Sequence, residues 1–214
     1  MTPEKRVINF YLLCNKLKNI IRTGWVNWHV DRDRLESVAE HIYSTQMLAI
    51  AINSEYKYDI DIQKVIYMLA VHEMEEIMIG DYTQFDISRE EKLKLGHEAI
   101  EKILSELADK DYIKQMILEF DERKTNEAFF AYQVDKLECD LQCKLYDEEG
   151  CIQVDLEKDR KNIHNDIALK KLEEGCSLSE MWMTFGRIRY NYDENFLKIS
   201  EYAQNNGILH SKQD

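Results

Sequence analysis

The sequence predicts an all-α protein, and three observations support that prediction. Apolar residues recur every three or four positions along most of the 214-residue chain, which is the period of an amphipathic helix. Glycine and proline, which interrupt helices, number only 7 and 1. No two alternating apolar runs joined by a tight turn indicate a strand hairpin. We therefore expect one domain of helices packed around a central core.

The first four predicted helices begin or end at recognisable residues. Pro3 behind Thr2 starts the first helix, and the chain breaks after it around Gly24. Gly80 ends the third helix, and Ser88 opens the fourth as the first residue of a capping box. The expected ranges are about 3–21, 36–57, 61–79 and 88–107.

The remaining predicted helices follow the same signals. The fifth begins at Asp109 or Asp111, and Gly150 follows the end of the sixth. A second capping box at Ser177 opens the last helix, which Gly207 follows. The fifth ends near 123, and the others cover about 125–148, 155–173 and 177–204.

The acidic composition limits the classes of partner. With a net charge of -13, the chain lacks the clustered Lys and Arg that nucleic acids or anionic membranes require. A phosphorylated substrate would need local positive charge from a metal or a few arginines. Five scattered cysteines indicate a reducing cytoplasm rather than a disulfide framework. We also expect no signal peptide and no membrane span, because no apolar run approaches ~20 residues.

Histidines and carboxylates lie in three of the predicted helices. His41 belongs to the second, Asp135 to the sixth, and His72, Glu73 and Glu76 to the third. Imidazole nitrogens and carboxylate oxygens are ligands of divalent transition metals. Glu76 follows His72 by four residues and so shares its helix face. The pattern indicates a metal centre between helices; the alternative is that both histidines are satisfied core residues and Glu76 is solvated.

Four longer motifs contain or flank these residues. They are Arg22-Thr23-Gly24-Trp25, Glu36-Ser37-Val38-Ala39-Glu40-His41, His72-Glu73-Met74-Glu75-Glu76-Ile77-Met78-Ile79-Gly80-Asp81 and Val134-Asp135-Lys136-Leu137. Together they resemble the HD-domain metal-dependent phosphohydrolases, whose signature is His … His-Asp … Asp, and most closely the 5'-deoxynucleotidase branch. The resemblance covers about residues 5–150. It implies a single-domain HD-type helical bundle, with an HD core over 1–150 and a C-terminal helical extension over 151–214 packed on it.

The resemblance also implies roles for individual residues. Four of them correspond to the metal ligands of the family: His41, His72, Glu73 and Asp135. Glu76 corresponds to a catalytic carboxylate that orients or deprotonates the attacking water. Trp25 and Asp81 correspond to positions that shape the sugar pocket. Arg22 is the nearest candidate for the phosphate-binding arginine, with Arg32 and Arg34 as alternatives.

The chain departs from the family pattern at two positions. Glu73 stands where the family has aspartate, so its longer arm either reaches the ion with a changed metal preference or degrades the site. A glycine, rather than an arginine, directly precedes Trp25. We expect Glu75 to be solvated or to support a metal ligand. We expect His97 to be a half-exposed helical histidine; the alternative for His97 is an approach to the site.

The expected function is hydrolysis of a phosphomonoester, namely a nucleoside or deoxynucleoside 5'-monophosphate. The expected cofactor is a divalent transition metal such as Mn, Co, Zn, Ni or Fe, with Mg as an alternative. One rival is an HD hydrolase of another phosphorylated small molecule; the other, motivated by Glu73, is a metal- or nucleotide-binding protein with little turnover.

We also expect a homodimer, because relatives are commonly dimers and the C-terminal region is rich in aromatic residues. These are Trp182, Phe185, Tyr190, Tyr192, Phe196 and Tyr202. They exceed what one surface helix needs and could form an interface. The alternative is that they close over the core of their own protomer.

Overall fold

The structure is a computed structural model that describes residues 1–83, 86–159, 162 and 166–209. Helices are the only regular elements in these residues, apart from an isolated antiparallel bridge between Ile21 and Ser37. The all-α prediction is therefore confirmed. The elements are α1 (Pro3–Cys14), the 3-10 helix η1 (Asn15–Asn19), α2 (Thr23–Asn27), α3 (Val38–Tyr56), α4 (Ile62–Val71), α5 (Glu76–Ile79), α6 (Arg89–Ile103), α7 (Asp111–Glu122), α8 (Asn126–Glu148), α9 (Leu156–Asp159), α10 (Asp166–Glu173), α11 (Leu178–Arg189) and α12 (Glu194–Asn205).

The chain forms two compact units. The first contains Met1–Thr23 and Glu36–Tyr132, and the second contains Gly24–Leu35 and Gln133–Asp214. The division falls inside helix α8, which begins in the first unit and continues in the second. The expected division into an HD core over 1–150 and an extension over 151–214 stays a prediction.

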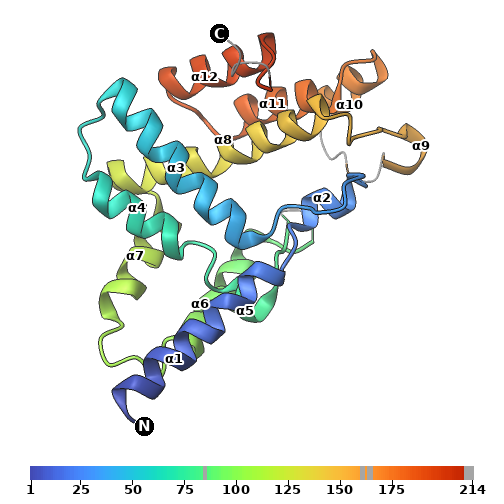
Figure 1. Cartoon of the computed structure of the whole chain (residues 1–214). Helices are drawn as coiled ribbons and strands as arrows, with labels where there is room; N and C mark the ends of the chain where they lie inside the picture. Colours follow the sequence, from blue (N-terminus) through green and yellow to red (C-terminus); the bar gives the residue numbers. More distant parts are fainter. Residues whose placement is uncertain (84–85, 160–161, 163–165, 210–214) are drawn as a thin grey trace. The chain divides into compact units, whose positions relative to one another are not determined.

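In the first unit, α4 packs against both α3 and α7, and α5 packs against α6 (Figure 1). Its core is built from buried aliphatic and methionine side chains, among them Val38 of α3, Met68 of α4 and Ile100 of α6. The capping box of Ser37 and Glu40 fixes the start of α3. The Ser88 side chain likewise caps α6 by accepting a hydrogen bond from the Glu91 backbone.

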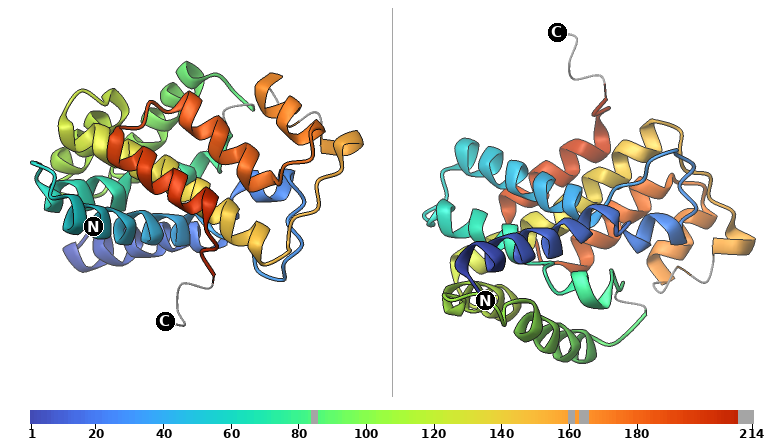
Figure 2. Two further views of the ribbon diagram at one scale, coloured as in Figure 1. Left: turned by 90° about the horizontal axis from the view of Figure 1, so that it is seen from above. Right: turned by 60° about the horizontal axis from the view of Figure 1, so that its bottom comes forward.

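In the second unit, α11 packs against α10 and α12, and Figure 2 shows α11 and α12 beside the second half of α8. The Tyr192 hydroxyl, between α11 and α12, donates a hydrogen bond to Asp140 of α8 at 2.9 Å. An aromatic and apolar core contains Trp25, Trp28 and Tyr146. No helix among the described residues is long and apolar enough to cross a membrane.

The predicted helix 61–79 is wrong as one continuous helix, because α4 ends at Val71 and α5 begins at Glu76. The cause is local. The His72 Nδ1 atom lies 2.8 Å from the Leu69 carbonyl oxygen, which a continuing helix would offer to the Glu73 backbone N–H. The chain instead makes a tighter turn, in which the Met74 N–H donates to the Val71 carbonyl at 3.1 Å.

The predicted helix 177–204 is also divided, into α11 and α12. Asn191 adopts a positive φ of 52°, and Asp193 then caps α12 by accepting hydrogen bonds from the backbones of Asn195 and Phe196. The first predicted helix, 3–21, becomes α1 followed by η1. Of the predicted helix 155–173, α9 and α10 are present, and residues 160, 161 and 163–165 lie outside the described residues.

Candidate metal centre

Two histidines and one carboxylate lie together inside the first unit. His41 comes from the first turns of α3 and is 0% exposed; His72 and Glu73 follow the end of α4 and are also buried. The His41 and His72 rings lie 5.5 Å apart, centroid to centroid. Each of the three residues offers one ligand atom, and these atoms lie within 4.8 Å of one another. The described residues therefore hold a cluster that can bind a metal ion.

The turn after α4 also orients the His72 ring. Because Nδ1 faces the Leu69 carbonyl at 2.8 Å, the proton belongs on Nδ1, and Nε2 keeps its lone pair. A hydrogen bond from the second ring nitrogen to a backbone carbonyl is typical of histidines that bind metals. The same contact that ends α4 thus leaves His72 Nε2 with a lone pair that a metal ion could take. Two imidazoles and a carboxylate are a donor set that suits Mn, Fe, Co, Ni and Zn.

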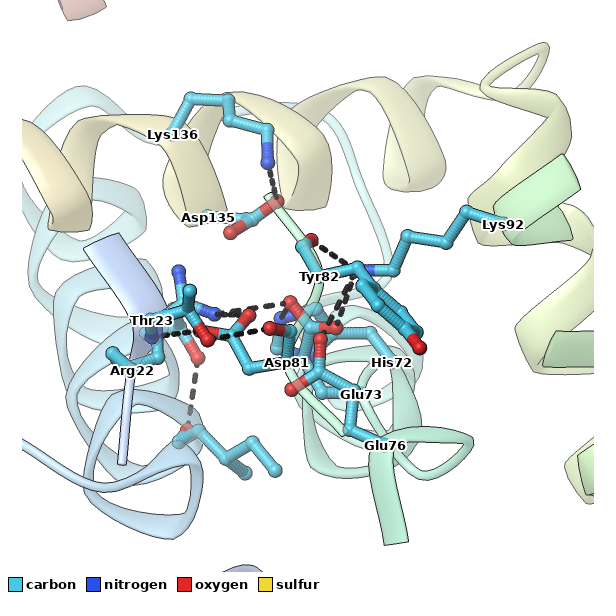
Figure 3. A network of polar contacts seen from close by, with 12 residues as sticks. Arg22, Thr23, His72, Glu73, Glu76, Asp81, Tyr82, Lys92, Asp135 and Lys136 are labelled. Atoms are coloured by element: carbon cyan, nitrogen blue, oxygen red, sulfur yellow. Dashed lines mark hydrogen bonds and ion pairs between the residues drawn. The ribbon is translucent and has the colours of Figure 1, made fainter. Parts of the chain in front are cut away.

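Cations face the carboxylate of Glu73 (Figure 3). Arg22 Nη1 lies 3.5 Å from Glu73 Oε1, and Lys92 Nζ lies 3.9 Å from Glu73 Oε2. Glu73 lies in the interruption between α4 and α5, which the sequence pattern did not reveal. It is both a candidate metal ligand and the partner of two positive side chains.

Arg22 and Asp81 form a second polar contact in the same unit. Arg22 Nη1 lies 3.5 Å from Asp81 Oδ1, and the Thr23 backbone N–H donates to Asp81 Oδ2. The Thr23 hydroxyl also donates to the Asp81 carbonyl at 2.6 Å (Figure 3). The segment that follows α5 is therefore fixed to Arg22 and to Thr23, the first residue of α2. Arg22 and Asp81, which we expected near the substrate, lie together beside Glu73.

Glu76 is completely buried at the start of α5. Lys92 of α6 donates a hydrogen bond to Glu76 Oε1 at 3.0 Å. Burial and then the charge of Glu73 raise the pKa of Glu76 well above its ordinary value, while Lys92 lowers it. The pKa of Lys92 is itself raised, because Glu73 and Glu76 outweigh the opposing effect of burial. Burial thus favours the neutral form of the Glu76 carboxyl group, whereas Lys92 favours its charged form.

Glu75 has different surroundings from a solvated residue, whereas His97 is half-exposed as expected. Glu75 packs its side chain under Gly96 of α6, and its Oε2 is enclosed; burial and then the charge of Glu73 raise its pKa to about 8. It is therefore not a solvated residue. His97 Nε2 lies 2.8 Å from Asp121 Oδ2, which gives this half-exposed histidine a partner on α7.

Two of the expected site residues belong to the second unit. Asp135 is buried on α8, and the Lys136 ammonium lies 2.8 Å from its Oδ2 (Figure 3). Trp25 is 2% exposed and packs against Tyr146 and Trp182 at ring-centroid distances of 5.3 and 5.4 Å. Its role in a sugar pocket stays a prediction.

The sequence pattern assigned no role to Lys92, Thr23 or Lys136. Lys92 is one turn inside a helix whose start the Ser88 cap fixes, but no sequence signal links it to Glu76, 16 residues earlier. The Thr23 contacts depend on the approach of two segments 58 residues apart. Lys136 directly follows Asp135 and was visible as its sequence neighbour.

Comparison with known proteins identifies the family. A family model described as HD domain matches residues 14–176. The protein named 5'-deoxynucleotidase HDDC2 from Dictyostelium discoideum is 35% identical over 150 residues, which cover 66% of this chain and 78% of that protein. Its namesake from Homo sapiens is 31% identical over 148 residues, covering 67% and 70%.

A solved structure shows the same fold. A structure titled as a predicted metal-dependent phosphohydrolase from Magnetospirillum magnetotacticum aligns with a TM-score of 0.58 and 22% identity. The alignment covers 93% of this chain and 95% of that one. The resemblance that the motifs indicated is confirmed: the chain belongs to the HD domain family.

Proposed function

We propose that the chain is a metal-dependent phosphohydrolase that converts nucleoside or deoxynucleoside 5'-monophosphates to nucleoside and phosphate. The observation that carries this proposal is the buried cluster of His41, His72 and Glu73 in a chain of the HD domain family. Eight curated proteins match the chain, and the named relatives described above are 5'-deoxynucleotidases.

The proposed ligands are His41, His72, Glu73 and Asp135. Helix α8 begins in the first unit, and Asp135 lies three residues beyond Tyr132, the last residue of that unit, and one turn beyond Ala131. Asp135 is proposed as the fourth ligand because it corresponds to the final aspartate of the family signature. A divalent cation held by these residues would supply positive charge for the phosphate and lower the pKa of a water molecule. Mn, Co, Zn, Ni and Fe suit the nitrogen and oxygen donors, and Mg is the alternative.

The remaining roles follow from charge and burial. Glu76 is proposed as the general base that orients and deprotonates the attacking water, because its enclosed carboxylate has a raised pKa. Arg22 is proposed to neutralise the phosphate, which a chain of net charge -13 would otherwise repel. Asp81 and Trp25 are proposed to shape the sugar pocket.

A second candidate function is that of a metal- or nucleotide-binding protein with little turnover. The observation in its favour is that Arg22 and Lys92 already face Glu73, at 3.5 and 3.9 Å, where they compete with a metal for its carboxylate. Hydrolysis of a different phosphorylated small molecule is the other alternative.

The test is a phosphate-release assay with a panel of ribo- and deoxynucleoside 5'-monophosphates and other phosphomonoesters. Chelator-treated protein is assayed before and after addition of Mn, Co, Zn, Ni, Fe or Mg. We expect metal-dependent release from nucleoside 5'-monophosphates. Release from other phosphomonoesters alone would favour the different substrate class. Nucleotide-induced thermal stabilisation without phosphate release would favour the binding protein.

We also propose a homodimer in a reducing cytoplasm. Of the six C-terminal aromatic residues, only Tyr202 is exposed, so most of the set packs within the second unit. The apolar face of α1 is a better-supported interface, because Val7, Ile8, Tyr11 and Leu12 are 56–64% exposed. Light scattering would test the dimer. The five cysteines are free thiols, which fits a reducing compartment.

A further inference from the structure

Lys92 is a half-buried lysine whose ammonium group lies close to three oxygen atoms. Its Nζ lies 3.0 Å from Glu76 Oε1, 3.3 Å from the Tyr82 carbonyl oxygen and 3.9 Å from Glu73 Oε2. An ammonium has three N–H donors, so these oxygens match its capacity. The three acceptors come from different parts of the first unit: the turn after α4, α5 and the segment after α5.

The two oxygens of the Glu76 carboxylate have different surroundings. Oε1 accepts the hydrogen bond from Lys92, whereas Oε2 is enclosed and finds no hydrogen-bond partner among the described residues. A carboxylate held by one oxygen keeps a fixed plane and presents the other oxygen in a fixed direction. Without Lys92, the buried Glu76 side chain would lose the contact that sets its orientation.

We propose that Lys92 is a positioning residue that anchors Glu76 Oε1, so that Oε2 is the oxygen that receives the proton from the attacking water. The inference rests on the proposed hydrolytic function. The step balances: a water O–H bond breaks and its proton goes to Glu76 Oε2, while the water oxygen bonds to phosphorus. The ester P–O bond breaks with its electron pair on the leaving oxygen, which takes up a proton from solvent to give the free hydroxyl. Lys92 remains a charged donor throughout and does not touch the substrate.

The test is a double-mutant cycle between Lys92→Met and Glu76→Gln, measured as kcat and KM for phosphate release at saturating metal. Methionine keeps the length of the stem and removes the donor. We expect Lys92→Met to lower kcat by about 10–100-fold with KM changed less than about threefold, because the lost interaction acts on the reacting geometry. In the Glu76→Gln background the same change should lower kcat by less than about twofold, because residues that act as one unit are not additive.

Three further variants complete the test. Lys92→Arg, which restores a charged donor, should recover at least part of the activity, and Lys94→Met, an exposed lysine on the same helix, should retain wild-type kcat. Lys92→Ala, which also removes the donor, is measured in parallel, so that a folding defect in the methionine variant does not remove the test. Circular dichroism and metal content are recorded for every variant.

The outcomes separate this inference from the proposed function. No phosphate release by the wild type would reject the proposed function. An active wild type with undiminished kcat in Lys92→Met, or in Lys92→Ala if the methionine variant does not fold, would overturn the positioning role. Equal losses in the wild-type and Glu76→Gln backgrounds would do the same, as would a loss explained by reduced metal content. Non-additive losses at normal metal content would support it.

Discussion

Replacing Gly186 with alanine should destabilise the protein more than the same replacement at Gly24 or Gly96, the other two glycines that lie in described helices. Gly186 lies on α11, facing Asp140 of α8, and an added Cβ would lie 2.5 Å from Asp140 Oδ2 and 2.9 Å from Oδ1. Carbon atoms do not approach oxygen so closely without displacement. Asp140 is 0% exposed and accepts the Tyr192 hydrogen bond, so it cannot move without disturbing that contact.

The expected magnitude follows from these contacts. Overpacking a filled interior position destabilises by about 1–3 kcal/mol. Weakening the buried Tyr192–Asp140 hydrogen bond adds about 1–2 kcal/mol. Alanine is favoured over glycine in a helix by about 1 kcal/mol, which offsets part of this loss. We therefore expect Gly186→Ala to lower the unfolding free energy by about 1–4 kcal/mol and the Tm by about 3–12 °C.

The assay is thermal unfolding followed by circular dichroism, with two graded comparisons. Gly96→Ala would bring a Cβ to 3.2 Å from Glu75 Cγ, so a smaller decrease is expected. Gly24→Ala would place it 3.9 Å from Trp182, an ordinary contact, so little change is expected. A Gly186→Ala variant as stable as Gly24→Ala would refute the packing of α11 on Asp140.

Three other predictions concern individual carboxylates. Glu76→Gln should keep the fold and metal content but lower kcat by about 10²–10⁴-fold, measured by phosphate release; unchanged turnover would remove Glu76 from the mechanism. Glu73→Asp should retain metal by elemental analysis, whereas Glu73→Ala should lose it; equal metal in both would exclude Glu73 as a ligand. Burial raises the pKa of Asp140 well above its ordinary value, against the lowering effects of Tyr192 and Arg187. The folded state therefore holds this proton more tightly than the unfolded state, and the resulting stability is present at low pH and lost as the pH rises from about 4. Asp140→Asn should weaken this pH dependence in denaturant titrations, and an unaltered slope would contradict the assignment.

The helical class was predictable because the evidence for it is local. Periodic apolar residues and caps such as Ser37 and Ser177 act within a few residues, and both serines cap helices in the structure. The interruption after Val71 was not predictable from periodicity, because it depends on His72 taking the Leu69 carbonyl from the backbone. Asn191 similarly divides a periodic segment through a positive φ.

The candidate site was only partly accessible from sequence. The motif drew attention to His41, His72 and Glu73, and the fold brings those three together. The lysine that bonds Glu76 was missed because its place depends on how α6 packs against α5, which no spacing rule encodes. The surroundings of Glu75 were missed for the same reason: a glycine on α6 leaves room for its side chain.

The most direct test of the metal centre is the metal content per chain of the wild type, His41→Ala and Asp135→Ala, measured by elemental analysis after reconstitution with Mn or Co. We expect about one tightly bound ion in the wild type and a marked loss of metal in both variants, because each removes a proposed ligand. The matched control is His97→Ala, which removes a half-exposed histidine paired with Asp121 and should keep its metal. Normal metal content in folded His41→Ala and Asp135→Ala would contradict the account.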